Sequence, residues 1–262
     1  MGKILKKSSL NILIPSILVL VSLTSWEFIV NRYDIPKRIL PGPISIFNYL
    51  LSDIESGKYT LIIKTLTSTR DALFGFGIAT VLGLFLGITF SQNNTLRHIF
   101  SPFTLITQLL PVPAFAPVVA SVLGYGIETK ILIIVVFTTF PVIVTVQNAI
   151  ERLSKNYKQL FSTYYAGKIE VIRYLLIPAI IPGLLTTMKI LTTASIVTSI
   201  ISELPLTVSG GIGKDIYNSF NNQITTRVWA SLILISAISL IFFYTVSIIE
   251  KNILQKYRYA KE

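Results

Sequence analysis

The feature that most constrains this chain is a set of long apolar runs that contain no charged residue. The runs from Ala72 to Phe90 and from Ile99 to Ile127 carry none. Each approaches or exceeds the ~20 residues with which an α-helix crosses a bilayer. Only 13% of the residues are charged, whereas a soluble domain of this size carries about 25%. The sequence therefore predicts an all-α membrane protein.

Six transmembrane helices are expected. The first covers Leu10–Val30, which is longer than the apolar part of a signal peptide and is followed by no small-x-small cleavage site. The other five are expected at residues 70–90, 99–124, 131–150, 175–202 and 228–249. The chain is predicted to have four parts. Residues 1–31 form an N-terminal transmembrane helix, and residues 32–60 form an extracytoplasmic connection with an interfacial helix beginning at Ile44. Residues 61–250 form a core of five transmembrane helices, and residues 251–262 form a cytoplasmic tail.

The basic residues set the expected orientation. Lys3, Lys6 and Lys7 precede the first span, and residues 151–173 carry five Lys or Arg against two Glu, which fits the cytoplasmic side. The extracytoplasmic connection is basic as well, but we expect both termini in the cytoplasm and a multi-pass protein of the cell inner membrane. The net charge of +11 lies in short runs between apolar spans. Membrane lipid is therefore an expected partner, and nucleic acid is not.

The sequence contains no arrangement that would support catalysis. There is no cysteine, and the single histidine, His98, could not build a metal site alone. The stretch Ser209–Asp215 contains glycines and a lysine, but a phosphate-binding loop needs Ser or Thr after Gly-Lys, and Asp215 stands there. We therefore expect no catalytic residue, metal, cofactor or ATP site in this chain.

Two of the spans carry glycines or prolines that bear on packing. Gly83 and Gly87 form a G-x-x-x-G pair, which allows helices to pack closely in lipid. The span at 99–124 contains four prolines, including Pro111 and Pro113. Proline kinks a helix, and in a membrane the freed backbone groups need protein or a cavity to satisfy them. We expect this span to be bent and internal, with Pro111 and Pro113 as candidates for a pathway.

Few ionisable residues lie within the spans, and the main ones are Glu27, Lys189 and Glu203. Such residues are functional candidates because burying a charge in lipid is costly. Lys189 is expected near mid-membrane and directed into the bundle, and Glu203 at the outer rim. On one helix the two share a face about 21 Å apart, too far for a direct pair. Contact with a solute and pairing with another span both remain open for each residue, and both are pathway candidates.

The segment from residue 151 to 177 is a basic interruption between apolar spans. A helix over Tyr157–Ala166, a chain reversal at Gly167 and a second helix over Lys168–Ile177 are expected, because glycine permits a reversal or a close backbone approach. Pro178 suits the first turn of the following helix, where its missing N–H is not needed. The alternatives are a structured docking element and a generic basic loop.

This segment resembles the cytoplasmic signature of binding-protein-dependent ABC transporter permeases. The signature has Glu-Ala-Ala, three residues, Gly, and about ten residues to a hydrophobic-Pro step, and Gly167 and Ile177-Pro178 stand in that order here. The branch that imports nitrate, sulfonates, taurine and thiamine precursors is similar over roughly residues 38–250. The matching stretches are "LPGPISIF" at Leu40–Phe47, the second span with Arg70, "LLPVPAFAPVVASVLGYGIETKILII", Lys189, Glu203 and the "SGGIG" turn.

The resemblance implies a six-helix permease of the type I importer, MetI-like, fold that dimerises around a central pathway, with a homodimer expected. It also implies a separate ABC ATPase subunit, an extracytoplasmic solute-binding protein and alternating access. The coupling residues it points to are Phe161, Ser162, Thr163, Gly167, Lys168 and Pro178. Phe161-Ser162-Thr163 replace the usual Glu-Ala-Ala, so a more apolar docking surface is expected. The alternative functions are an ATPase-independent secondary carrier and a substrate-capture membrane component.

Overall fold

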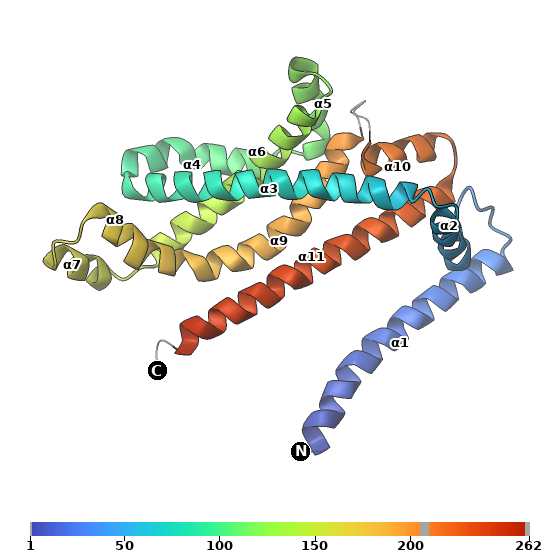
Figure 1. Ribbon diagram of the computed structural model, residues 1–262, viewed down its shortest axis with the longest axis horizontal. Coiled ribbons are helices and arrows are strands. Elements are labelled where there is room, and N and C mark those ends of the chain that lie inside the picture. Colours follow the sequence, from blue (N-terminus) through green and yellow to red (C-terminus); the bar gives the residue numbers. More distant parts are fainter. Residues whose placement is uncertain (1, 205–209, 260–262) are drawn as a thin grey trace. The chain divides into compact units, whose positions relative to one another are not determined.

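A computed structural model of the protein describes residues 2–204 and 210–259, and within them all side chains except those of residues 2–12, 94, 105, 158 and 256–259. The side chains of Lys3, Lys6 and Lys7, and Ser209 of the glycine turn, lie outside these described parts. Every regular element in the described residues is a helix (Figure 1). This is the expected outcome in a bilayer, because a helix satisfies its own backbone hydrogen bonds.

Five helical stretches in the described parts are long and apolar enough to cross a membrane. The pair formed by α4 (Asn94–Leu109) and α5 (Val112–Leu123) makes a sixth if it is counted as one broken span. The five are Leu13–Arg32, Thr60–Gln92, Ile127–Glu151, Lys168–Glu203 and Thr225–Gln255. Most run past the apolar stretches from which they were predicted. The chain separates into two compact units, the first formed by residues 1–63 and 215–234 and the second by residues 64–214 and 235–262.

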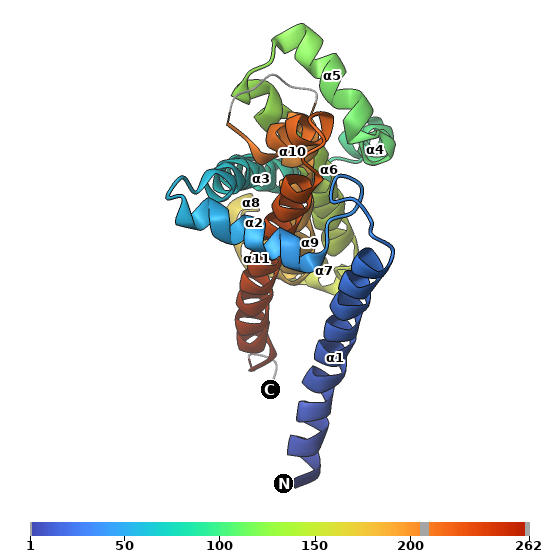
Figure 2. The same cartoon turned by 90° about the vertical axis from the view of Figure 1, so that its right-hand side faces the viewer.

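The first unit contains α1 (Gly2–Arg32), α2 (Pro43–Glu55), most of α10 (Ile212–Asn221) and the start of α11 (Thr225–Tyr259). The predicted short helix near Ile44 is confirmed as α2 (Figure 2), and Pro43 lies in the first turn of this helix. Glu27 of α1 accepts a hydrogen bond from the Ile44 N–H at 3.1 Å, so this membrane-span carboxylate holds the start of α2.

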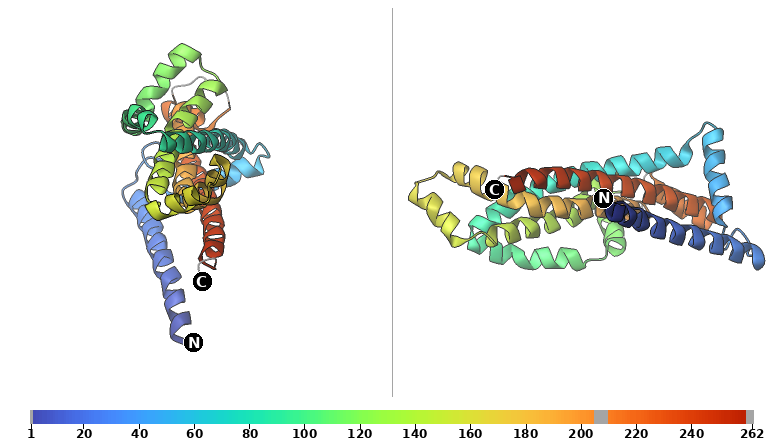
Figure 3. Two further views of the ribbon diagram at one scale, coloured as in Figure 1. Left: turned by 90° about the vertical axis from the view of Figure 1, so that its left-hand side faces the viewer. Right: turned by 90° about the horizontal axis from the view of Figure 1, so that it is seen from below.

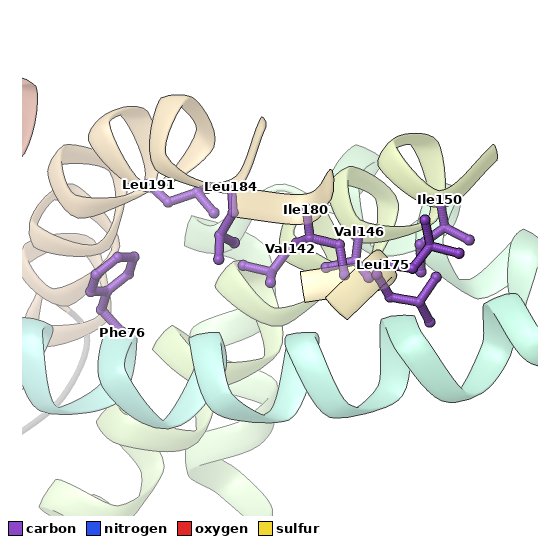
Figure 4. Close-up of a cluster of buried hydrophobic side chains, with 9 residues drawn as sticks. Phe76, Val142, Val146, Ile150, Leu175, Ile180, Leu184 and Leu191 are labelled. Atoms are coloured by element: carbon purple, nitrogen blue, oxygen red, sulfur yellow. The ribbon is translucent and has the colours of Figure 1, made fainter. Parts of the chain in front are cut away.

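The second unit is built around α3 (Thr60–Gln92), α6 (Ile127–Glu151) and α9 (Ile177–Glu203), which lie alongside one another (Figures 1 and 3). Nine buried side chains form its core (Figure 4). They are Phe76, Val142, Val146, Ile150, Leu175, Leu176, Ile180, Leu184 and Leu191. A Cβ atom at Gly83 or Gly87 would lie 2.6 or 2.7 Å from the Cβ of Val142 or Val146, respectively. The packing role predicted for this glycine pair is therefore confirmed.

The span expected over 99–124 is bent, as predicted, but it is not one continuous helix. Two helices, α4 (Asn94–Leu109) and α5 (Val112–Leu123), meet at an angle of 107° (Figures 1 and 2). Leu110 is extended (ψ 125°), as a residue before proline favours, and Pro111 caps α5. The two prolines, Pro111 and Pro113, lie two residues apart. Together they end one helix and start the next, instead of kinking a continuous helix. Both prolines are exposed in this chain.

Candidate functional site

The predicted docking element forms the tip of the second unit, beyond the ends of α6 and α9 (Figures 1 and 3). It begins with α7 (Lys155–Thr163), whose N-cap residue Ser154 accepts a hydrogen bond from the Asn156 N–H. After a short turn follows α8 (Lys168–Val171). The helix–turn–helix predicted for this segment is present, and a loop without regular structure is excluded.

The turn differs from the prediction in which residue reverses the chain. Tyr165 has φ +50°, whereas Gly167 has φ −67° and ψ 159°, an extended conformation open to any residue. A Cβ atom on Gly167 would meet only the Glu170 carboxylate, at 3.7 Å. The Gly167 N–H donates to that carboxylate at 2.7 Å, which fixes the start of α8. Within this chain, therefore, neither a left-handed turn nor a close backbone approach requires a glycine at position 167.

The second predicted helix does not end at Ile177. A π-helical segment, η1 (Ile172–Leu176), joins α8 to α9, so the chain is helical without a break from Lys168 to Glu203. Pro178 lies in the first turn of α9, as predicted. Its ring would clash with the carbonyl four residues earlier, that of Tyr174, in a regular α-helix. The π turn lies at that position and opens the helix there.

The three residues at the position of the family's acidic triplet do not behave alike. Phe161 packs against the buried core, while Ser162 and Thr163 donate their hydroxyls to the carbonyl of Gln159 at 2.7 and 3.0 Å. Phe161 and Ser162 line a cavity of about 430 Å³, and Lys168 lies on its wall. Phe161 thus supports the segment from inside and is not part of its exposed face.

The outer face of the segment carries large apolar and aromatic side chains in contact with solvent. Tyr165 is the extreme case, with 95% of its surface exposed. A helical tip of this composition is a surface that another protein can cover. The exposed side chains are Tyr157, Leu160, Tyr164, Tyr165 and Ile169.

Lys189, a pathway candidate, is paired with another helix. Its ammonium group lies 2.7 Å from the carboxylate of Glu250 on α11, and Thr186 donates to the same carboxylate at 2.6 Å. The two charged side chains are 21% and 13% exposed. The Lys189 ammonium also lies over the Phe243 ring, 5.7 Å from its centroid. Of the two alternatives left open, pairing with another span is what the structure contains.

Glu203, the last residue of α9, is buried. Its residue surface is 1% exposed, and its carboxylate accepts hydrogen bonds from the Ser68 hydroxyl at 2.7 and 2.9 Å and from the Gly213 N–H at 2.7 Å. It also forms an ion pair with Lys130, which is 2% exposed. Lys130 in turn contacts Asp71 at 2.8 Å. We refer to Asp71, Lys130 and Glu203 as the charge cluster.

The charge cluster is electrically balanced by one exposed residue. Arg70 donates to the Asp71 carboxylate through two nitrogens at 3.1 and 2.9 Å while its side chain remains largely in solvent. Two cations thus face two carboxylates. Buried charges are tolerated where they are paired and hydrogen-bonded in this way.

The glycine turn is fitted onto this cluster. Side chains at Gly211 and Gly213 would overlap the Glu203 carboxylate, and one at Gly213 would also overlap the Ile200 carbonyl. The Ile212 N–H donates to the Ser68 hydroxyl at 2.9 Å. The glycines therefore allow the start of α10 to approach a buried carboxylate, which is a packing role that their sequence alone did not indicate.

Asp71 and Lys130 were missed by the sequence reasoning. Each stands immediately outside an apolar run, at the edges of the spans expected at 70–90 and 131–150, where a charge is typical of a loop. The helices in fact begin at Thr60 and Ile127, so both residues lie inside them. One sequence signal could have revealed these residues: three apolar spans each have a charged residue at one end, and these charges are not all of the same sign.

Three comparisons with known proteins agree with this architecture. A family model described as "Binding-protein-dependent transport system inner membrane component" matches residues 79–258, more than half of the chain. The formylaminopyrimidine transport permease protein ThiX of Halalkalibacterium halodurans is 26% identical over 257 residues, covering 96% of this chain and 98% of that protein. The nitrate import permease protein NrtB of Synechocystis sp. is 20% identical over 243 residues, covering 90% and 87%.

Among solved structures, an inward-facing form of the MetNI methionine ABC transporter has a similar fold. One of its chains superimposes with a TM-score of 0.65 at 17% identity, over 76% of this chain and 98% of that chain. This similarity confirms the type of all-helical fold predicted from the sequence.

Proposed function

This chain belongs to the family of binding-protein-dependent transport system inner membrane components, and from that premise we propose how it takes part in transport. It is a permease component of an ABC importer, in the nitrate, sulfonate and thiamine-precursor branch. We propose that a separate ABC ATPase drives it, that an extracytoplasmic solute-binding protein delivers its solute, and that two copies of the chain enclose the pathway. The family gives no support to an ATPase-independent carrier or a substrate-capture component.

The observation that carries the ATPase part of this proposal is the exposed tip formed by α7 and α8. It presents tyrosines and aliphatic side chains outward, with Tyr165 almost fully exposed. Its inner side is anchored by Phe161 in the core. A short, well-supported helical tip can enter a groove on a partner and transmit force, which a flexible loop cannot. The exposed tyrosine and aliphatic side chains of the tip make this proposed docking chiefly apolar.

Force applied at the tip has a direct route through the chain. The helical stretch Lys168–Glu203 is continuous, and at 1.5 Å per residue its 36 residues span about 54 Å. One end lies in the docking tip and the other in the charge cluster. Closure of the ATPase pair would draw two such tips together and rock the attached helices, exposing the pathway to the opposite side in alternating access. Pro111, Pro113, Lys189 and Glu203 remain pathway candidates on this proposal.

The solute class proposed is a small organic or inorganic molecule: a sulfonate, nitrate, taurine or a pyrimidine-like compound. The names of the relatives support this range, since one transports formylaminopyrimidine and another imports nitrate. The family name and the apolar helices support a multi-pass inner-membrane protein. The basic segment 151–173 supports placing the docking tip and both termini in the cytoplasm.

The docking proposal is tested with Gly167→Trp. The position has open space in this chain, so the variant should fold and insert, and only a partner's surface can reject its side chain. We expect loss of co-purification with the ATPase and loss of ATP-dependent uptake. Gly77→Trp is the matched control, because a Cβ atom at Gly77 of α3 would meet nothing within 4 Å, and one at Gly167 would meet only the Glu170 carboxylate, at the ordinary contact distance of 3.7 Å.

Two outcomes would contradict the proposal. If Gly167→Trp retains the ATPase and normal uptake, α7 and α8 are not the docking surface. If the purified chain alone supports uptake of radiolabelled nitrate, taurine or formylaminopyrimidine in proteoliposomes, the carrier alternative is correct.

A further inference from the structure

The charge cluster joins four helices at one point. Asp71 comes from α3, Lys130 from α6 and Glu203 from the last residue of α9. The Glu203 carboxylate also accepts the Gly213 N–H in the first turn of α10. A single lysine therefore stands between two carboxylates that belong to different helices.

The three charges of the cluster depend on one another for burial. A buried charge without its partner is strongly unfavourable, so Lys130 cannot stay in place if either carboxylate moves away. In the apolar surroundings of a membrane helix the same holds with more force. The three helices and the start of α10 therefore keep one mutual arrangement for as long as these charges stay buried.

The seat of α10 depends on Lys130 through Glu203. Because no side chain fits at Gly211 or Gly213, the backbone of the turn rests directly on the carboxylate. A shift of that carboxylate would displace the turn, since the Gly213 N–H follows its acceptor. Ser68 reinforces the seat by accepting the Ile212 N–H while donating to Glu203.

We propose that Lys130 is a positioning residue for transport: it holds Glu203 so that the start of α10 stays seated on α3, α6 and α9 throughout the transport cycle. This rests on the proposed function. The helix Lys168–Glu203 leads from the docking tip to the cluster, so movement of the tip reaches residues 212–214, at the start of α10, only while the cluster holds. Lys130 thereby sets how much solute is moved for each ATP hydrolysed, although it touches neither the ATPase surface nor ATP.

The decisive variant is the double substitution Lys130→Met with Glu203→Gln. It removes one positive and one negative charge together, so the buried net charge stays that of the wild type, and glutamine keeps an oxygen for the Gly213 N–H. We expect normal membrane insertion but at least a tenfold faster amide exchange at Ile212 and Gly213. Uptake per ATP hydrolysed should fall at least tenfold. Lys130→Met alone should show the same defects together with reduced expression.

The assays use the full chain with its ATPase and binding protein in proteoliposomes, with radiolabelled nitrate, taurine and formylaminopyrimidine as probes. Arg97→Met with Glu151→Gln is the matched control, because it removes an exposed ion pair between α4 and α6. We expect that control to equal the wild type in amide exchange at Ile212 and Gly213.

The proposal is overturned if the double variant keeps wild-type amide protection at Ile212 and Gly213, or if it keeps wild-type uptake per ATP despite losing that protection. A wild-type complex that shows no ATP-dependent uptake of any probe would contradict the proposed function instead. In that case the amide exchange of the variants still decides whether Lys130 seats α10.

Discussion

Replacing Gly83 with alanine should weaken the packing of α3 against α6, whereas the same change at Gly77 should not. Both glycines lie in α3, six residues apart in sequence. A Cβ atom at Gly83 would lie 2.6 Å from the Val142 Cβ, 2.7 Å from its Cγ1 and 3.0 Å from the carbonyl oxygen of Thr139. A Cβ atom at Gly77 would meet nothing within 4 Å.

The magnitude follows from two opposing effects. Alanine is favoured over glycine inside a helix by up to about 1 kcal/mol, and this gain applies to both sites. At Gly83 the new methyl group must displace a fully buried valine and a backbone carbonyl, and overpacking of this kind costs about 1–3 kcal/mol. The variant Gly83→Ala should therefore be less stable than Gly77→Ala by about 1–3 kcal/mol, while Gly77→Ala should equal or exceed the wild type.

The measurement is unfolding of each purified variant in mixed detergent micelles by SDS titration, followed by far-UV circular dichroism. Tryptophan fluorescence is not suitable, because both tryptophans, Trp26 and Trp229, lie in the other compact unit. Equal unfolding midpoints for Gly83→Ala and Gly77→Ala would refute the close contact between α3 and α6.

Three further changes test other parts of the second unit. The hydroxyls of Thr145 and Thr187 lie 2.9 Å apart, and the chain has no cysteine. The double variant Thr145→Cys with Thr187→Cys should therefore form a disulfide under mild oxidation, and free thiols that persist in mass spectrometry would contradict the contact. A left-handed conformation costs an L-residue about 1–2 kcal/mol, so Tyr165→Gly should keep or raise the melting temperature; a lower value would mean that the exposed ring makes a stabilising contact. Lys189→Met should cost about 1–3 kcal/mol, between an exposed and a buried pair, and adding Glu250→Gln should recover most of it; if the second change recovers nothing, the pair is not formed.

The architecture could be predicted from the sequence because its physical basis is local. A run of about 20 apolar residues has few alternatives to a membrane helix, and α3, α6, α9 and α11 follow from that rule. The break between α4 and α5 could not be placed in the same way. Proline predicts a disturbance, but whether Pro111 bends a helix or ends it depends on the backbone of Leu110, which the composition does not specify.

The charge cluster could not be predicted for a different reason. Asp71 and Lys130 are far apart in the sequence, and each alone marks the polar edge of a span. These residues become buried only when three helices pack together, because each charged side chain then supplies the ion-pair partner that the others need. Glu203 was recognised as unusual, yet its burial depends on residues that local pattern analysis assigns to loops.

The segment 151–177 could be predicted from the sequence only in part. Its helix–turn–helix form and the position of Pro178 follow from the sequence. The reversal at Tyr165 in place of Gly167 does not, because glycine was the only residue there that adopts a left-handed backbone without a steric penalty. The chain reverses at the exposed residue Tyr165 instead.

The π-helical segment at Ile172–Leu176 lets the chain carry one extra residue without redirecting the tip formed by α7 and α8. A π turn is equivalent to an α-helix that has gained one residue, and its wider turn absorbs that residue locally. Deleting one residue there should restore regular α-helical winding and leave α7 and α8 pointing in nearly the same direction relative to α9. Deleting one residue from the regular part of α9 would instead rotate the tip by about 100° around the helix axis.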